Sequence, residues 1–373
     1  MRYASPKRLL FVISSFYGGG AEMVLVHMIN YFHQKRYAME LVVFDNFLDY
    51  CQLIPKDVSV HCLHKKNRMD FVRLVKDLRT IIRRIRPDVV FSLMFYTNVL
   101  TVLSSRWVGK RFRLILCEHI YLPTFLQAGT FSSLKSKIVP YTYNRADWVV
   151  GVSKSIRTSL VRDFKVNPLK TVTIYNPIPL EDIRKKAEAA VEHPFLSGDY
   201  TVLLSAGRLK PQKRFDRLLK AFGTVARQRS NTVLLIMGEG TLRFELENLS
   251  RELGIRDRVD FVGFQRNPFA WMSKADLFVL SSDFEGLPMT LLEAMACGVP
   301  VVSTDCPSGP AEIIIENENG LLSPLDDGAL AATILELLND PARLKRFQSG
   351  ALRRSADFGI EKAMAQYEAL IGS

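Results

Sequence analysis

Two acidic residues in the second half of the chain carry the strongest chemical signal in the sequence. Glu285 and Glu293 have seven residues between them, and Pro288 lies where a helix can begin after an apolar run. Glu285 is therefore expected on a loop and Glu293 on a helix whose first N–H groups, at Met289 and Thr290, are free. Carboxylates accept hydrogen bonds from sugar or ribose hydroxyls, and a helix start binds phosphate. The pattern favours a site for a polyol with a phosphate, although two ordinary surface acids at a helix start have the same pattern.

A second candidate is the basic loop Gly207–Lys213, which directly follows a predicted strand. Arg208 presents a planar fork of donors to phosphate oxygens and Lys213 adds a point charge, so the two suit a diphosphate leaving group. A basic loop by itself is more often solvated surface. Its position after the first strand of the second half favours a binding role.

Two further features lie in the first half. Gly18, Gly19 and Gly20 separate a predicted strand from a predicted helix, where glycine lets the backbone approach an anionic group. The spacing fits neither the dinucleotide fingerprint nor the Walker A loop, so a simple tight connection stays open. His119 follows another predicted strand and is either a hydrogen-bonding or proton-accepting group or a structural histidine. The six histidines include no H-x-x-x-H helix, so no metal site is predicted.

Apolar, β-branched runs alternate with amphipathic stretches along the chain, which is typical of α/β units around a parallel sheet. The strands predicted in the first half are Arg8–Ser14, Met39–Phe44, Val58–Cys62, Asp88–Leu93, Leu114–Cys117, Trp148–Val152 and Thr171–Ile174. Those predicted in the second half are Thr201–Ala206, Thr232–Met237, Val259–Val262, Leu277–Leu280 and Val299–Ser303. Ligands of open α/β sheets bind at the carboxyl ends of the strands, so the chemistry is expected on the loops that follow them.

The clearest predicted helix spans Met69–Arg86, with its buried face at Val72, Val75, Leu78, Ile82 and Ile85. In the second half, helices are predicted to start at Arg214, Leu242 and Met289, with two more after Asp326. The prolines in 176–179 and the charged, weakly structured stretch 180–198 break the pattern. We therefore predict two Rossmann-like domains, 1–178 and 179–355, followed by a C-terminal helix in 356–373 that packs back on the first domain.

Composition limits the class of protein. A chain of 373 residues with 48% hydrophobic and 24% charged residues is an ordinary globular protein of two domains. Its five cysteines are odd in number and contain no C-x-x-C pair, which argues against a disulfide framework and fits a reducing cytoplasm. No apolar run reaches the roughly 18 residues that a membrane-spanning helix needs.

The net charge of +12 is unevenly distributed. Residues 1–180 contain 27 Lys and Arg against 11 Asp and Glu, a balance of +16, whereas the remainder has 23 against 27, a balance of −4. A basic first half suits nucleic acid, an anionic membrane or an anionic substrate, and charge alone does not choose among them.

The segment Phe284–Asp305 resembles the signature of glycosyltransferase family 4, retaining enzymes of the GT-B fold. Shorter matches follow the order of the family and extend the resemblance over nearly the whole chain; they are Gly18–Glu22, Gly207-Arg208 with Lys213, Gly238–Gly240 and Gly320–Leu322. The resemblance implies an α/β protein of two Rossmann-like domains with an interdomain cleft. It also implies transfer of a sugar from a nucleotide diphosphate sugar.

The resemblance implies roles for individual residues. Arg208 and Lys213 would bind the donor diphosphate, with Glu293 on the ribose and Glu285 on the transferred sugar. His119 would lie beside that sugar. The remaining donor-binding residues would be Gly19, Gly20, Gly238, Phe264, Gly286, Leu287, Met289 and Thr290.

Family members need no metal ion or cofactor, which agrees with the lack of an Asp-x-Asp motif. Retention without an enzyme nucleophile implies a front-side displacement in which the leaving phosphate helps to deprotonate the acceptor. Among donors, a UDP-hexose or UDP-N-acetylhexosamine is the expected choice, and the segment 306–312 resembles bacterial surface-polysaccharide enzymes.

The first domain of this family binds the acceptor, here expected to be a glycan, a lipid-linked sugar or lipopolysaccharide. Four segments mix cations with apolar groups and suit anionic lipid headgroups; they are 65–68, 83–86, 106–113 and 122–126. We therefore expect a cytoplasmic protein in peripheral contact with the inner face of the membrane. Scattered surface cations over core aromatics are the alternative.

Two other interpretations remain. A sugar phosphorylase or a nucleotide-sugar epimerase of the same fold would bind similar ligands, although the sequence shows no cofactor lysine motif. A basic nucleic-acid-binding protein would fit the sequence pI near 9.5, but no recognisable nucleic-acid-binding motif is present, so no nucleic-acid partner is expected.

Overall fold

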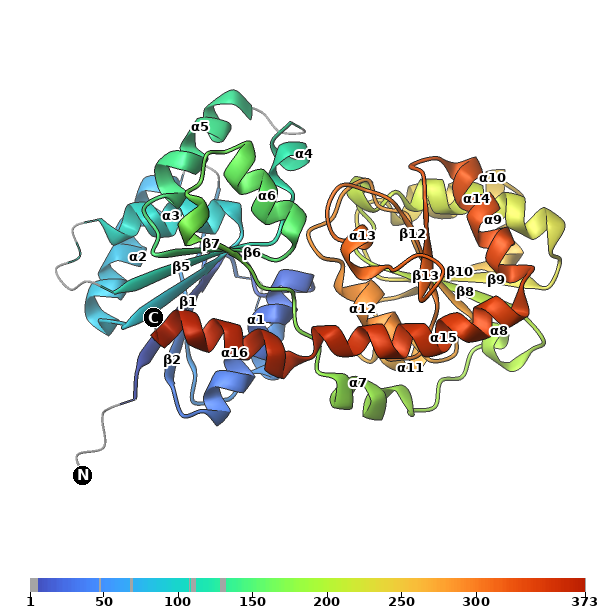
Figure 1. Cartoon of the computed structure of the whole chain (residues 1–373), viewed down its shortest axis with the longest axis horizontal. Coiled ribbons are helices and arrows are strands. Elements are labelled where there is room, and N and C mark those ends of the chain that lie inside the picture. The colour runs from blue at the N-terminus through green and yellow to red at the C-terminus, as the bar shows by residue number, and fades with distance from the viewer. Residues whose placement is uncertain are drawn as a thin grey trace. The chain divides into compact units, whose positions relative to one another are not determined.

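A computed structural model of the chain describes residues 6–46, 48–67, 70–106, 108, 112–127 and 132–372, with backbone alone for 132–135. The chain divides into two compact units (Figure 1). Unit 1 comprises Met1–Pro177 and Ile360–Ser373, and unit 2 comprises Ile178–Gly359. The chain thus passes between units after residue 177 and again after residue 359, where the sequence had suggested boundaries after 178 and 355.

The described part of unit 1 contains a parallel sheet of seven strands in the order β3-β2-β1-β4-β5-β6-β7. Its strands are β1 (Arg8–Ile13), β2 (Ala38–Val43), β3 (Ser59–Cys62), β4 (Val89–Leu93), β5 (Arg113–Glu118), β6 (Trp148–Gly151) and β7 (Thr171–Thr173). All seven predicted strands are confirmed, with ends that shift by at most one residue. The sheet is covered on both faces, which explains why its strands are nearly continuous apolar runs.

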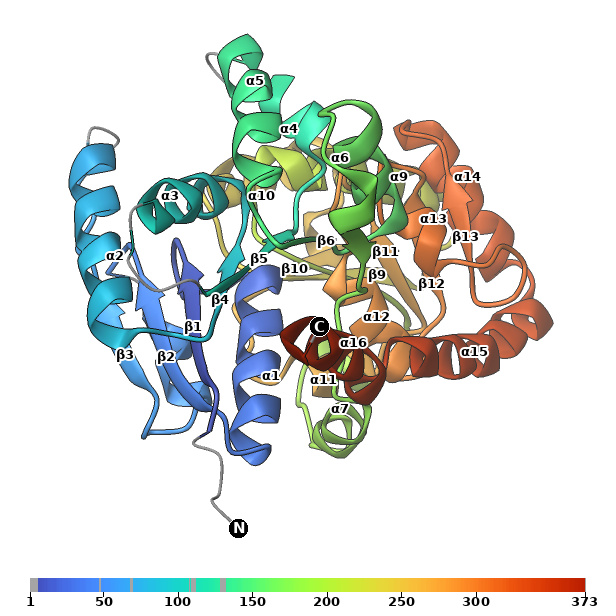
Figure 2. The same cartoon turned by 60° about the vertical axis from the view of Figure 1, so that its left-hand side comes forward.

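The helices of unit 1 lie on both faces of this sheet. They are α1 (Gly20–Gln34), α2 (Phe71–Ile85), α3 (Phe95–Ser105), α4 (Leu122–Gln127), α5 (Ser132–Tyr143), α6 (Lys154–Arg162) and α16 (Ile360–Gly372). Figure 2 shows α2 and α3 on one side of the sheet and α1 with α16 on the other. On the second side, stacked Phe11, Phe32 and Phe91 form an aromatic cluster between the strands and α1.

Helix α16 is part of unit 1, although unit 2 separates it from the rest of that unit in sequence. Tyr367 is 1% exposed, and its ring meets Phe91 edge-on with centroids 6.0 Å apart. At the end of α16, the Arg113 guanidinium donates to the carbonyls of Leu370 (3.1 Å) and Ile371 (2.6 Å). A cation at a helix C-terminus is favourable because it interacts with the negative end of the helix dipole.

The predicted buried face of α2 is wrong at its start. Val72 is 62% exposed, whereas Leu74, Leu78 and Ile82 are fully buried. A spacing of four keeps these three leucine and isoleucine side chains on one stripe along the helix. Met69, the predicted first residue of the helix, lies outside the described residues.

Unit 2 contains, within its described residues, a parallel sheet of six strands in the order β10-β9-β8-β11-β12-β13. Its strands are β8 (Thr201–Ala206), β9 (Thr232–Met237), β10 (Val259–Gly263), β11 (Leu277–Leu280), β12 (Val301–Thr304) and β13 (Gly320–Ser323). The first five were predicted. Strand β13 is an addition, since a four-residue run that begins with glycine gives little strand signal.

The helices of unit 2 correct two predictions. They are α7 (Leu180–Ala187), α8 (Pro194–Ser197), α9 (Phe215–Gln228), α10 (Arg243–Glu252), α11 (Pro268–Met272), α12 (Met289–Ala296), α13 (Pro310–Ile313), α14 (Asp327–Leu338) and α15 (Pro341–Ser355). The stretch expected to be weakly structured contains α7 and α8. Three helices, α14, α15 and α16, follow Asp326 where two were predicted.

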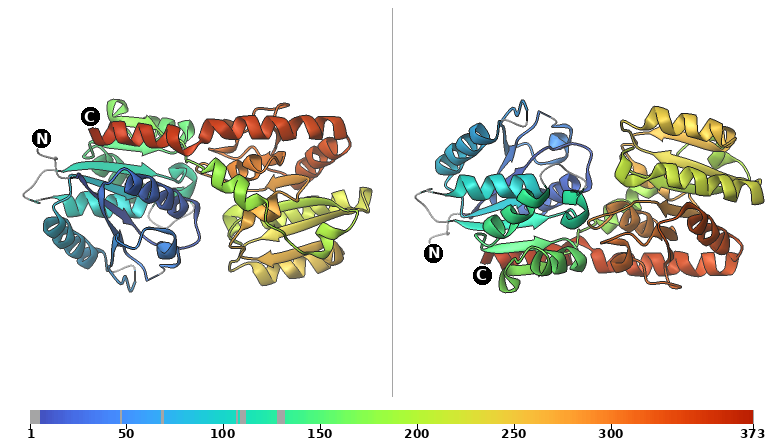
Figure 3. Two further views of the ribbon diagram at one scale, coloured as in Figure 1. Left: turned by 90° about the horizontal axis from the view of Figure 1, so that it is seen from below. Right: turned by 90° about the horizontal axis from the view of Figure 1, so that it is seen from above.

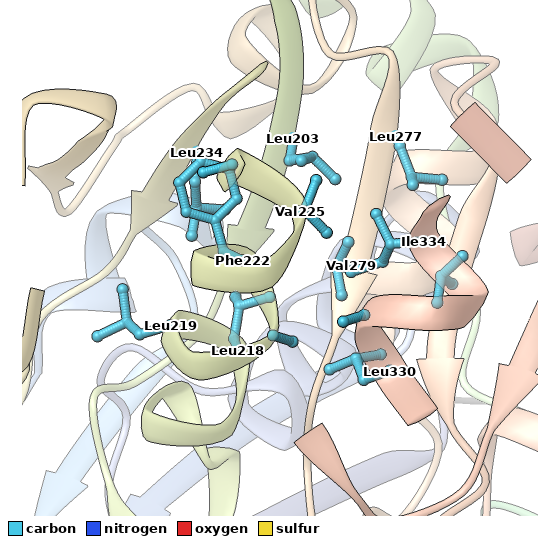
Figure 4. Close-up of a cluster of buried hydrophobic side chains, with 14 of the residues drawn as sticks. Leu203, Leu218, Leu219, Phe222, Val225, Leu234, Leu277, Val279, Leu330 and Ile334 are labelled. Atoms are coloured by element: carbon cyan, nitrogen blue, oxygen red, sulfur yellow. The ribbon is translucent and has the colours of Figure 1, made fainter. Parts of the chain in front are cut away.

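Helices flank each sheet on both faces in the views of Figure 3. On one face of the unit 2 sheet, α9 and α14 pack over the strands and against each other (Figure 4). Leu218, Phe222 and Val225 of α9 meet Leu330 and Ile334 of α14 in one buried cluster. This rigid core holds the loops at the carboxyl ends of the strands.

Candidate functional site

The residues predicted to bind the donor in the second half lie at the carboxyl edge of the unit 2 sheet. Arg208 and Lys213 follow β8, Gly238 follows β9, Phe264 follows β10 and Glu285 follows β11. Strand order reverses between β8 and β11, and ligands of open α/β sheets bind at such a switch point. The topology therefore gathers these residues at the expected edge.

Lys213 and Glu285 are in direct contact. The Lys213 ammonium lies 2.6 Å from Oε1 of Glu285, and the Ser282 hydroxyl donates to the same oxygen at 2.6 Å. The Glu285 residue is only 7% exposed. Among the described residues no donor reaches its Oε2. The carboxylate is thus held firmly by one oxygen and has acceptor capacity left on the other.

Several contacts that the sequence did not predict tie the two loops together. The Gln212 side-chain amide donates to the Phe284 carbonyl at 2.7 Å, and the Asp283 N–H donates to the Gln212 carbonyl at 2.9 Å. Arg217 donates to the Ser281 carbonyl and to the Asp283 carboxylate, both at 2.8 Å. One residue in the sequence does indicate these contacts, Arg217 on the apolar face of α9. Arginine is almost never buried without a partner, so its position there implies a nearby acceptor.

Arg208 differs from Lys213 because its side chain is exposed. Among the described residues its guanidinium has no hydrogen-bond or ion-pair partner. The loop that carries it is fixed where the Leu209 N–H donates to the Glu239 carbonyl at 2.9 Å. A free guanidinium on a fixed loop is suited to bind an anionic ligand.

Gly238 has a steric reason to be glycine. Its φ is +126°, and a Cβ at this position would lie 2.0 Å from the carbonyl oxygen of Gly207. The missing side chain therefore lets the loops after β8 and β9 touch. Beside it, the Gly238 N–H donates to the Gly263 carbonyl at 2.8 Å, and the next residue, Phe264, is 60% exposed. An exposed aromatic ring offers a stacking surface for a flat base.

The start of α12 has the form of an anion site. Its N-cap residue, Pro288, gives no side-chain hydrogen bond to the helix. The N–H groups of Met289 and Thr290 lie in the first turn, where no helical carbonyl reaches them. The Thr290 hydroxyl is buried without a partner in the described part of the chain. Gly286 and Leu287 are buried in the preceding loop, where the Ser308 hydroxyl donates to the Gly286 carbonyl at 2.8 Å.

Glu293 lies one turn after Met289 on the same face of α12. Part of its side chain reaches the surface, but burial of the carboxyl raises its pKa from 4.5 to about 7. One turn further, burial and the neighbouring Glu293 raise the pKa of Cys297 to about 12. No hydrogen bond to the Glu293 carboxyl oxygens is present among the described residues. This carboxyl is therefore more readily protonated than an exposed one and is open to hydroxyl donors.

The raised pKa of Glu293 makes the stability of unit 2 depend on pH. Because the folded-state pKa lies above the unfolded value, stability is complete below about pH 4.5 and falls as pH rises through about 7. The loss from this group is on the order of 3 kcal/mol or less. Glu293→Gln should remove that slope, as measured by urea unfolding at pH 5 and pH 7.5 with hydrogen exchange of unit 2 amides. Glu245→Gln, at an exposed acid of α10, should leave the slope unchanged, and an equal slope in Glu293→Gln would contradict the assignment.

The glycine turn of unit 1 is packed on an acidic side chain. Gly19 is the N-cap of α1, and Gly20 is its first residue. A Cβ on Gly19 would lie 2.1 Å from a carboxylate oxygen of Glu22, which is 3% exposed and accepts the Ser15 hydroxyl at 3.2 Å. The glycine at 19 thus makes room for Glu22.

His119 directly follows β5 and is 9% exposed. Neither ring nitrogen has a hydrogen-bond partner among the described residues. Burial lowers the pKa of His119 to about 3, so the imidazole is neutral at physiological pH. A neutral imidazole with two free nitrogens suits hydrogen bonding to a ligand better than proton uptake. Of the predicted site residues, His119, Gly19 and Gly20 belong to unit 1 and all others to unit 2.

The predicted membrane-facing segments are partly corrected. Leu122 and Leu126 are each 2% exposed, so they belong to the core of unit 1, whereas Phe125 is 38% exposed. Lys65 pairs with Asp45 at 3.7 Å. The predicted residues Arg68, Trp107, Gly109, Lys110 and Arg111 lie outside the described residues.

An open groove of about 310 Å³ runs beside α2. Its lining combines apolar and basic side chains, from Phe71, Val72, Val75, Lys76, Arg79, Leu103 and Arg106. Across the described residues, no helix combines the length and the apolar character needed to span a membrane.

Comparisons with known proteins agree with this architecture. The family described as Glycosyltransferase Family 4 matches residues 18–182, and that described as Glycosyl transferases group 1 matches residues 187–354. The chain is 30% identical to N-acetylgalactosamine-N,N'-diacetylbacillosaminyl-diphospho-undecaprenol 4-alpha-N-acetylgalactosaminyltransferase of Campylobacter jejuni, over 94% of this chain and 96% of that protein. It is 28% identical to lipopolysaccharide 1,6-galactosyltransferase of Escherichia coli, over 85% and 84%.

Solved structures show the same fold. HepE of Anabaena, in complex with UDP and glucose, has a TM-score of 0.84 at 20% identity and covers 98% of this chain and 99% of its own. Sucrose-phosphate synthase of Thermosynechococcus elongatus has a TM-score of 0.80 at 19% identity, with 98% of each chain covered. The predicted GT-B type of two-domain α/β fold is confirmed.

Proposed function

The chain belongs to glycosyltransferase family 4, and on this premise we propose that it is a retaining hexosyltransferase that uses a UDP-sugar. The observation that carries the proposal is the Lys213–Glu285 ion pair beside the start of α12, at the carboxyl edge of a doubly wound sheet. A UDP-hexose or UDP-N-acetylhexosamine is the proposed donor. In support, the two relatives named above are a galactosyl- and an N-acetylgalactosaminyltransferase, and HepE was solved with UDP and glucose.

The leaving UDP is stabilised by positive charge. Arg208, with its free guanidinium, and Lys213 bind the diphosphate, and the N–H groups of Met289 and Thr290 add neutral donors. As the sugar–phosphate bond breaks, negative charge grows on the phosphate oxygens, and prearranged cations lower the energy of that state. We infer that these groups make a metal ion or cofactor unnecessary, so turnover should be equal with and without EDTA.

The transferred sugar is held by carboxylate and imidazole groups. Glu285 accepts sugar hydroxyls through its free Oε2, and the neutral His119 donates a hydrogen bond to the sugar. Glu285 is tied to Lys213 and Ser282 through Oε1, which favours a positioning role over nucleophilic attack. The acceptor then attacks the face from which UDP leaves, and the departing phosphate takes its proton, so the anomeric configuration is retained.

The nucleoside has its own contacts. Glu293 accepts the ribose hydroxyls, and the exposed ring of Phe264 stacks on the base beside the Gly238 turn. In unit 1, Gly19 and Gly20 let the backbone approach the diphosphate and the acceptor.

The acceptor is proposed to be a lipid-linked or lipopolysaccharide glycan in assembly of a bacterial surface polysaccharide. The names of the Campylobacter and Escherichia relatives support this class.

Residues 70–86 carry six Lys and Arg against two Asp, and part of this charge lines the groove beside α2. We propose that this basic surface contacts the anionic inner face of the cell membrane. Sedimentation with vesicles should therefore rise with their anionic lipid content and fall with added salt.

The experiment that tests the proposed function measures thermal unfolding with UDP, UDP-sugars, orthophosphate and duplex DNA. A ligand at 100 times its Kd stabilises the folded state by about 2.7 kcal/mol. UDP should raise the Tm and DNA should not, and a screen of UDP-sugars should find one whose sugar is released or transferred. A Tm that rises with DNA alone would contradict the proposal, and sugar release that requires orthophosphate would favour a phosphorylase.

Arg208→Ala should lower turnover of the donor at least tenfold. One hydrogen bond to a charged group contributes about 1.5–3 kcal/mol, which corresponds to a factor of about ten or more in rate. The Tm should stay unchanged because the guanidinium has no partner in the described part of the chain. Initial rates of sugar release measure the effect, with Lys220→Ala, an exposed lysine of α9, as the matched control. Equal rates in the variant and the wild type would remove Arg208 from the site.

A further inference from the structure

Unit 1 contains a carboxyl group that the proposed reaction does not use. Glu118 ends β5 and is 0% exposed. No cation pairs with it in the described part of the chain. Its Oε1 accepts the N–H groups of His119 (3.1 Å) and Ile120 (3.2 Å), and its Oε2 accepts the Tyr143 hydroxyl at 2.5 Å. Three donors therefore replace the water that burial removed.

The contacts of Tyr143 extend this arrangement into two helices. Tyr143 lies at the end of α5 and is fully buried, and its hydroxyl accepts the Asn98 side-chain amide at 3.1 Å. The same amide nitrogen, in the first turns of α3, donates to the Cys117 carbonyl at 3.2 Å. The network thus joins the end of β5 to α3 and α5, which lie together in unit 1 in Figure 1.

A buried carboxyl group such as that of Glu118 lowers the stability of the fold. Burial raises the pKa of Glu118 to about 7 and raises that of Tyr143 well above its usual range. An apolar side chain in this place would fill the core without desolvating a carboxyl. The three hydrogen bonds therefore point to a role other than stability.

The contacts themselves indicate the role. Both N–H groups bound to Oε1 belong to the turn that carries His119, whose ring nitrogens have no partner among the described residues. We propose that Glu118 is a positioning residue that fixes the backbone of 119–120, and that Tyr143 and Asn98 hold Glu118 in place. The inference rests on the proposed function, in which His119 contacts the transferred sugar. The fixed turn presents the imidazole to that sugar in one orientation. The entropy cost of orienting the imidazole in the transition state is therefore smaller.

Hydrogen exchange tests the fixed turn without any need for activity. Glu118→Ala should speed exchange of the 119 and 120 amides at least tenfold, because they lose their acceptor. Glu118→Gln keeps an oxygen at Oε1 and should stay within threefold of the wild type. Tyr143→Phe covers the case that Glu118→Ala does not fold, and it should speed exchange less, since Oε1 remains. The proposal is overturned if exchange of the 119 and 120 amides is unchanged in both Glu118→Ala and Tyr143→Phe. If Glu118→Ala does not fold, unchanged exchange in Tyr143→Phe alone overturns it.

Kinetics with the UDP-sugar test whether the network acts through His119. Tyr143→Phe should lower kcat about tenfold, with KM for the donor within twofold, whereas Glu118→Gln, which keeps the acceptor for the turn, should stay within threefold of the wild-type kcat. In a His119→Ala background Tyr143→Phe should change kcat less than twofold. Equal losses in both backgrounds would mean a general structural effect and would overturn the proposal, as would a His119→Ala variant of full activity. Thr142→Val, at a buried neighbour that bonds within α5, should leave kcat unchanged.

The two proposals fail in different ways. A wild-type protein that neither binds UDP nor turns over a UDP-sugar contradicts the proposed function, and the exchange rates at 119 and 120 then decide the positioning role alone. A wild-type enzyme with normal turnover whose Tyr143→Phe variant keeps full kcat contradicts the positioning role and leaves the proposed function intact.

Discussion

Lys213→Ala is expected to lower kcat for sugar transfer by about 100- to 1000-fold, the loss typical when one prearranged donor to a developing negative charge is removed. Two effects act together. The departing diphosphate loses a cation, and the carboxylate of Glu285, a residue that is 7% exposed, keeps only the Ser282 hydroxyl as a hydrogen-bond donor in the described residues. Breaking a buried ion pair in this way also destabilises the fold, by about 3 kcal/mol. Rates of sugar release and the Tm of the same samples separate the two effects.

Matched variants define what the Lys213 result means. Lys213→Met keeps the length of the side chain without its charge and should lose activity as Lys213→Ala does. Lys213→Arg keeps the charge in a different geometry and should lose about tenfold, because a planar fork does not replace a point charge. Lys220→Ala should behave as the wild type. Turnover of Lys213→Ala within threefold of the wild type would remove the central contact of the proposed site.

Tyr367→Ala is expected to destabilise unit 1 by about 3–5 kcal/mol, the range for loss of a large buried aromatic side chain. The ring is 1% exposed and packs edge-on against Phe91 at the centre of the sheet. Its removal leaves a cavity beneath α16 that the rigid sheet cannot fill. Urea unfolding followed by hydrogen exchange of unit 1 amides measures the loss.

Controls for Tyr367 lie on the same helix and in the other unit. Tyr367→Phe keeps the ring but loses the hydrogen bond between its hydroxyl and the Cys117 thiol, so it should cost only about 1 kcal/mol. Lys362→Ala, at an exposed position of α16, should cost nothing measurable. The Kd for UDP should stay within twofold in all three variants, since all the proposed side-chain contacts to UDP lie in unit 2. A loss below 1 kcal/mol in Tyr367→Ala would show that α16 is dispensable to the core.

The strands were predictable because a parallel sheet covered on both faces needs long apolar, β-branched runs. The apolar runs Leu9–Ile13 and Val233–Met237 fit few elements other than a buried strand. Helix faces were harder. Apolar residues occur at 71, 72, 74, 75 and 78 of α2, so two different stripes fit the period, and packing against the sheet and α3 selects the one through Leu74. Helix α7 was missed because Ile183 is its one buried residue, which leaves almost no periodic signal.

The residues of the candidate site also divide into those that the sequence predicts and those that only the structure reveals. Sequence placed Arg208, Lys213 and Glu285 on loops after strands, and the strand order of unit 2 brings those loops to one edge. The contact of Lys213 with Glu285 spans 72 positions in sequence, and the supporting contacts of Arg217 span up to 66. The contact between Glu118 and Tyr143 joins residues 25 positions apart. No local pattern encodes such pairs, since they exist only once the strands and helices are packed.

Unit 1 is assembled from two stretches of chain with all of unit 2 between them. As the protein is synthesised, the residues of unit 2 emerge together and close their core while the part of the first sheet that α16 covers, beside Phe91, is still exposed. That part is covered only when residues 363–371 leave the ribosome. Unit 1 therefore completes its fold last although it is made first, and its core stays incompletely packed throughout the translation of residues 178–359.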